Sequence, residues 1–214
     1  MKRKSSIIML GLIGTMCTFG LSGCSEKSPM KLGKVTGMYV GIEKPLSYKV
    51  KNTVETGGGK SWSNTETPSI VSLKVGSIMD SGDRLEFLYN IGDKSANPVG
   101  GLEGEDVISL NLNYNLTLPS ISPTEKLLPY VRIGGTYLIS SDKYYDESYS
   151  NKYNYKAVGA TIGLGTYYQV MNKVNVYAGF DYGYRLWDDL TYGYTTVESE
   201  DTVTKMYVGA DYSF

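Results

Sequence analysis

Apolar residues recur at every second position in eight separate segments between residues 35 and 214. In the clearest segment, Val158–Gly165, valine, alanine, isoleucine and leucine alternate with glycine and threonine. A period of two places residues on the two faces of a β-strand, whereas a helix needs a period near 3.6. We therefore predict an all-β chain of eight antiparallel strands. The predicted strand segments are 38–42, 71–75, 85–91, 108–116, 131–139, 158–164, 174–184 and 206–214.

The connections between these segments alternate in length. Short connections are predicted at 80–83, 119–126 and 171–173, and long loops at 49–67, 92–106, 140–156 and 188–202. Short turns at one end and long loops at the other are typical of a transmembrane up-and-down β-barrel. This order places both termini at the short-turn, periplasmic end and four long loops outside the cell.

The polar faces of the segments carry charges of both signs and most of the glycines. Glycine weakens a water-facing strand, but inside a narrow barrel it leaves room for long neighbouring side chains. We predict that the charged residues form a polar network inside the barrel and that the apolar face meets lipid. A solvated polar face, as in a lipid-anchored lipocalin-like binding protein, is the alternative. The inward set consists of Glu43, Lys74, Arg84, Glu86, Arg132, Asp181 and Arg185.

The amino terminus has the pattern of an export signal. Three basic residues at 2–4 precede an apolar run at 7–21, which is too short to span a membrane stably. The run ends in Leu-Ser-Gly-Cys24, which resembles a bacterial lipobox, although Cys24 could simply follow an ordinary cleavage site. We predict a signal peptide at 1–23, possible lipidation of Cys24, a short polar linker at 24–34 and a barrel at 35–214.

The composition excludes several classes of function. The chain contains no histidine, which removes Ser-His-Asp and Cys-His catalysis and the commonest metal ligand. Its formal net charge of −1 gives no basic surface of the kind that binds nucleic acid. We therefore expect no enzymatic activity, no catalytic or metal-binding residue, no cofactor and no nucleic-acid partner.

The carboxyl-terminal segment Tyr207–Phe214 resembles the terminal signal read by the barrel-assembly machinery, with Gly209, Tyr212 and Phe214 as its key residues. Segments 38–42, 128–135 and 158–168 look like the first, fifth and sixth strands of the opacity-type "porin family" barrel domain. This resemblance implies an eight-stranded barrel in the outer membrane of a Gram-negative bacterium, with outer-membrane lipids and the barrel-assembly machinery as partners. Functions in that family include adhesion, host-factor binding and envelope stabilisation.

The expected role is structural or adhesin-like, with a surface ligand bound through the four long loops. Tyrosine beside serine, asparagine and aspartate is typical of adaptable binding surfaces, although tyrosines also line membrane interfaces. A narrow channel or a conduit for small hydrophobic ligands is an alternative, although side chains fill an eight-stranded barrel. The loop tyrosines are Tyr144, Tyr145, Tyr149, Tyr153 and Tyr155 in one loop and Tyr192 and Tyr194 in another.

Overall fold

The computed structural model describes residues 33–59, 61–95, 105–146, 151–192 and 195–214. The predicted signal peptide, Cys24 and nearly all of the predicted linker lie outside the described residues. Residues 35–214 form one compact unit. No helix among the described residues is long and apolar enough to cross a membrane.

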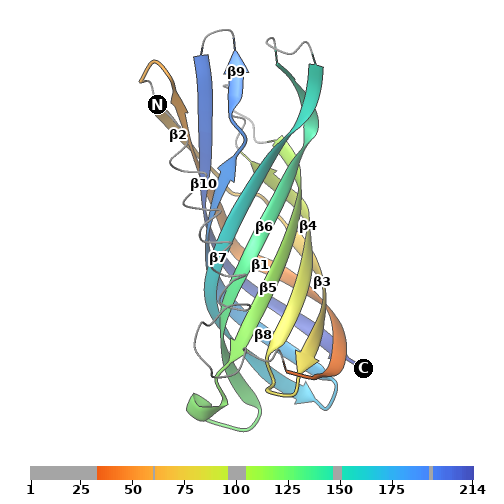
Figure 1. The fold of residues 1–214 in the computed structure, drawn as a ribbon. Helices are drawn as coiled ribbons and strands as arrows, with labels where there is room; N and C mark the ends of the chain where they lie inside the picture. Colours follow the sequence, from red (N-terminus) through yellow and green to blue (C-terminus); the bar gives the residue numbers. More distant parts are fainter. Residues whose placement is uncertain (1–32, 60, 96–104, 147–150, 193–194) are drawn as a thin grey trace, which may run out of the picture. The chain divides into compact units, whose positions relative to one another are not determined.

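The chain is all-β, and its strands are antiparallel and run up and down, as predicted (Figure 1). They form one ten-stranded sheet, and the only other element described is a short 3-10 helix, η1, at Pro119–Ile121. The strands are β1 Val35–Thr56, β2 Ser61–Glu66, β3 Val71–Met79, β4 Arg84–Ser95, β5 Glu105–Thr117, β6 Leu127–Asp146, β7 Asn151–Met171, β8 Val174–Trp187, β9 Leu190–Tyr192 and β10 Thr195–Ser213.

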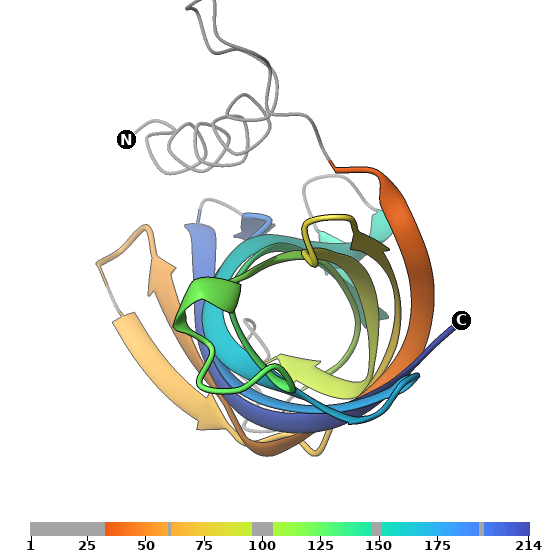
Figure 2. The same cartoon turned by 90° about the horizontal axis from the view of Figure 1, so that it is seen from below.

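The sheet closes on itself, because β1 pairs with β3 along one side and with β10 along the other. The remaining pairs follow chain order from β3 to β8, and β8 pairs with β10, so the strands enclose an interior (Figure 2). The last residue takes part in the closure, since the Phe214 amide donates to the Met38 carbonyl at 2.9 Å. The closed sheet has no free edge along this seam.

The predicted count of eight strands is wrong, because the structure has ten. The two additional strands, β2 and β9, lie in segments predicted as the long loops 49–67 and 188–202. Both β2 and β3 pair with β1, and Pro68, which has no amide donor for a ladder, lies between them. Both β8 and β9 pair with β10, and two aspartates, Asp188 and Asp189, separate them.

The predicted long loops are also largely wrong, because strands continue into all four segments. Strand β1 continues to Thr56, strand β6 continues to Asp146, and strand β10 begins at Thr195. The polarity of the two faces inverts there, and this makes the segments look like loops in the sequence. Apolar residues now join the inward face, where they form a buried cluster of Val54, Val107, Leu138, Tyr155, Ala157, Trp187 and Val197.

Candidate functional site

A belt of exposed apolar side chains covers the outer face of the closed sheet. On β7 it runs from Val158 to Tyr168, which matches the roughly 9–11 residues that a tilted strand needs to cross a bilayer. Exposed apolar patches on this scale mark a membrane or protein interface. The belt, as we use the term, consists of Met38, Val40, Ile42, Val71, Leu73, Val75, Phe87, Tyr89, Ile91, Ile108, Leu112, Leu116, Ile133, Tyr137, Val158, Ile162, Leu164, Tyr168, Val176, Phe180, Tyr182, Met206, Val208 and Tyr212.

Behind the belt lies a network of buried charged side chains. All seven residues of the predicted inward set are at most 5% exposed. Six of them lie at the level of the belt, where they alternate along the strands with its apolar residues. The seventh, Arg185, lies nearer the far end of the sheet, where it contacts Tyr48 at 2.6 Å and Asp93 at 3.3 Å.

Arg132 is the hub of this network. Its guanidinium lies 2.7 Å from Glu86 on β4, 2.9 Å from Asp181 on β8 and 3.6 Å from Glu43 on β1. The Arg132 Nε also donates to Asn115 at 3.0 Å. One side chain from β6 thus reaches the neighbouring β5 and also β1, β4 and β8, which do not pair with β6 and can be reached only across the interior. The side chains therefore fill this cross-section of the closed sheet.

Two further members of the network, Lys205 and Asp211, are absent from the predicted inward set. The Lys205 ammonium lies 2.7 Å from Glu43 and 3.1 Å from Asp181. Asp211 accepts from Arg84 at 2.8 Å. The sequence pattern could have predicted both, because they alternate with the apolar positions 206–214 and therefore belong to the opposite face.

Four inward tyrosines each lie over a glycine of a neighbouring strand. The pairs are Tyr39 with Gly76, Tyr130 with Gly165, Tyr177 with Gly209 and Tyr207 with Gly179, and in each a glycine Cβ would overlap the tyrosine ring. Tyr177 passes over Gly209 to donate its hydroxyl proton to the Ile42 carbonyl at 3.0 Å. This contact ties β8, β10 and β1 together beside the closing seam.

Replacing Gly209 with alanine is expected to destabilise the closed sheet by about 1–3 kcal/mol, the usual cost of overpacking. The new Cβ would overlap the Tyr177 ring and lie 2.5 Å from the backbone oxygen of Ile42. Gly37→Ala is the matched control, because its Cβ would meet nothing closer than 3.9 Å. Denaturant titration in phospholipid vesicles measures both variants. Equal stability of the two would contradict the assigned packing at Gly209.

The three predicted assembly residues do not share one face. Tyr212 and Phe214 are exposed on the outer face, at 49% and 62%. Gly209 has the opposite parity and faces inward beneath Tyr177. The carboxyl-terminal pattern therefore combines two outward aromatic residues with an inward glycine that leaves room for the Tyr177 ring.

Asp83 holds the β3–β4 turn against the end of β5. It accepts hydrogen bonds from the Thr117 amide at 2.8 Å, from the Tyr114 hydroxyl at 2.8 Å and from the Ser81 hydroxyl at 2.8 Å. Burial raises the pKa of Asp83, but these hydrogen bonds outweigh it and hold that pKa below its usual value. The charged form of Asp83 therefore stabilises the turn.

Asp83→Asn is expected to lower the free energy of unfolding by about 1–3 kcal/mol at neutral pH. Because the folded pKa is lowered, the contribution is fully present above the unfolded pKa of about 4 and is lost as the pH falls through the folded value. The gap between wild type and variant should therefore shrink below about pH 4. Denaturant titrations at several pH values measure it, and a gap independent of pH would refute the role of the charge.

The structure places the tyrosines of the predicted loops in different locations. Tyr155 is wrongly placed in a surface loop, because it is 1% exposed and stacks on Trp187 inside the sheet, with ring centroids 4.8 Å apart. Tyr149 and Tyr194 lie outside the described residues. The backbones of Tyr144, Tyr145, Tyr153 and Tyr192 lie in strands β6, β7 and β9.

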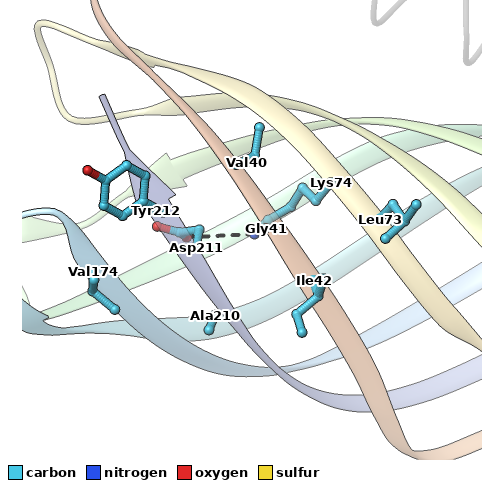
Figure 3. Close-up of a pocket in the computed structure, with 9 residues that line it drawn as sticks. All are labelled: Val40, Gly41, Ile42, Leu73, Lys74, Val174, Ala210, Asp211 and Tyr212. Atoms are coloured by element: carbon cyan, nitrogen blue, oxygen red, sulfur yellow. Dashed lines mark ion pairs between the residues drawn. The ribbon is translucent and has the colours of Figure 1, made fainter.

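A shallow groove of about 480 Å³ lies where β1, β3, β8 and β10 approach one another (Figure 3). Its wall is mostly apolar and includes Val40, Ile42, Leu73 and Tyr212 of the belt. Figure 3 also shows the ion pair of Lys74 and Asp211 beside Gly41, with 3.9 Å between the charged atoms. Among the described residues, no group of three or more acidic or cysteine side chains is placed to hold a metal ion.

No family model and no curated protein matches the sequence. Among solved structures, Neisserial surface protein A is 12% identical, with a TM-score of 0.48 over 83% of this chain and 97% of its own. OprG from Pseudomonas aeruginosa is 13% identical, with a TM-score of 0.47 over 86% and 98%. The N-terminal β-barrel domain of OprF from the same organism is 13% identical, with a TM-score of 0.40 over 80% and 99%. These structural neighbours are outer-membrane β-barrel proteins.

Proposed function

We propose that this chain is an integral β-barrel of the outer membrane of a Gram-negative bacterium. The observation that carries the proposal is the reversed polarity at the level of the belt, with apolar residues outside and paired charges inside. A water-soluble barrel has the opposite arrangement. Lipid also demands that every backbone group be paired, which a closed sheet provides.

We propose a structural or surface-interaction role rather than an enzymatic one. Beyond the belt the outer face turns polar, with Lys51 and Glu55 exposed, while the interior becomes apolar. This arrangement suits a strand-built wall that stands in water above the bilayer and presents a rigid surface to a ligand. The Arg132 network fills the interior and argues against a channel for bulk solutes. The charged interior at the level of the belt likewise argues against a lipocalin-like binder, whose interior is apolar.

Fractionation of a Cys24→Ser variant tests this proposal. The belt offers a far larger apolar surface than an acyl anchor, so the variant is expected to stay in the outer membrane and to migrate differently on a gel before and after boiling. Wild-type protein is the control. A variant found soluble in the periplasm would contradict the integral barrel and favour a lipid-anchored binding protein.

A further inference from the structure

Three exposed lysines, Lys44, Lys49 and Lys51, lie on the outer face of β1 at one border of the belt. A strand of regular period would place Lys44 and Lys49 on opposite faces. The register shift between Pro45 and Ser47 adds one residue and brings all three lysines to the outside. The bulge therefore gathers positive charge on one strip of the wall, next to Ile42.

The residues directly opposed to these lysines are uncharged, and Glu200, opposite Thr53, lies diagonally from Lys51 at the end of the strip. Opposed residues of an antiparallel pair share a face, and the partners on β10 are Val208 for Lys44, Thr204 for Lys49 and Thr202 for Lys51. On β2, the partner of Lys51 is Thr65. The Lys44 ammonium donates to the Ser69 hydroxyl and to the Ile70 carbonyl, both at 3.1 Å. Apart from Val208 and from Glu200 at its end, the strip presents ammonium groups and hydroxyls among the described residues, which suits an anionic oxygen ligand.

The apolar groove begins directly below this strip. Ile42, which lines it, is the next outward residue before Lys44, and Leu73 and Ala210 continue the wall on β3 and β10. Ala210, between Val208 and Tyr212 on the outer face of β10, carries only a methyl group and leaves room at the groove. The groove thus offers an apolar channel that leads away from the lysines.

We propose that this seam binds a phosphate-bearing lipid of the membrane. The headgroup phosphate lies among Lys44, Lys49 and Lys51, and one acyl chain lies in the groove along Ile42 and Leu73. A free anion would not use the apolar groove, and lipid surrounds the belt under the proposed function, on which this inference rests. The lysine stems extend the apolar contact while their ammonium groups reach the headgroup level.

Titration of lipid A into phosphatidylcholine vesicles that hold the full-length mature protein tests the site. Lipid A is expected to raise the temperature at which the protein is heat-modified. The measured quantity is the fraction of lipid A that gives half of the maximal rise. In the variant Lys44→Gln, Lys49→Gln, Lys51→Gln this fraction is expected to rise roughly fivefold per lysine and about a hundredfold in all. The matching triple arginine variant should keep the wild-type response.

The control removes the same charge at the other end of the closed sheet, with Lys34→Gln, Lys126→Gln and Lys173→Gln, all exposed positions. It should respond like wild type, and equal losses in both triple variants would overturn the site. Ala210→Phe, which fills the groove, should also weaken the response. An unchanged response of Ala210→Phe to lipid A would mean that no acyl chain occupies the groove.

Two further outcomes are decisive. If inorganic phosphate added to pure phosphatidylcholine vesicles stabilises the protein as lipid A does, the site binds an anion and not a lipid, and the proposal is overturned. If wild type inserts and shows heat modification but the lysine variant responds to lipid A unchanged, the lipid site fails while the barrel stands. Failure of wild type to insert at all would instead count against the proposed function.

Discussion

Arg132→Met is expected to lower the free energy of unfolding by about 3–5 kcal/mol, the cost of leaving buried charges without their partner. The guanidinium lies 2.7 Å from Glu86 and 2.9 Å from Asp181, and all three residues are at most 3% exposed. Lys74 and Lys205 remain near these carboxylates, but neither replaces the guanidinium, whose two terminal nitrogens contact different carboxylates at once. Unfolding of the barrel by guanidinium chloride in phospholipid vesicles measures the loss of stability.

The double variant Arg132→Met, Glu86→Leu is the informative control. Replacing both partners of a buried pair by apolar residues often restores much of the stability lost by removing one. We therefore expect the double variant to be more stable than Arg132→Met alone. A loss below about 1 kcal/mol for Arg132→Met would be the value of a solvated surface pair and would place the network in a water-filled interior.

Ile162→Arg is expected to destabilise the barrel by about 2–4 kcal/mol, because it places a charge on the belt, which the proposed function assigns to lipid. Ile162 is 58% exposed on the outer face of β7. Thr53→Arg is the matched control. Thr53 is on the outer face of β1 beyond the belt, opposite Glu200, so we expect a change within about 1 kcal/mol.

The same vesicle titration measures both arginine variants. Equal stabilities would mean that position 162 faces water, and the assignment of the belt to lipid would then be wrong. A larger loss of stability for Thr53→Arg than for Ile162→Arg would mean that the strand ends, and not the belt, lie in lipid.

The parity of the strands could be predicted from the sequence at the level of the belt. There, outward Ile42 alternates with inward Glu43, and outward Phe87 with inward Glu86. Strong contrast between lipid-facing and inward residues makes such a period visible. The partners of Arg132 could not be predicted, because parity gives the face of a residue but not its register against distant strands.

The ends of the strands could not be predicted, because the polarity rule inverts at the border of the belt. Beyond it, Val54 faces inward and Lys51 outward, so a strand there reads as a polar, glycine- and threonine-rich loop. The register shift between Pro45 and Ser47 also breaks the period within β1. The two short strands β2 and β9 were not predicted either, because they lie in the segments 49–67 and 188–202 that were predicted as loops.

Under the proposed function the belt lies in lipid and the strand ends beyond it lie in water. Nitroxide labels on cysteines at positions 162 and 53, in a Cys24→Ser background, test it most directly in reconstituted vesicles. The label at 162 is expected to collide mainly with dissolved oxygen, which concentrates in lipid, and the label at 53 mainly with a water-soluble nickel complex. A label at 162 that is relaxed by the nickel complex as strongly as the label at 53 would contradict it.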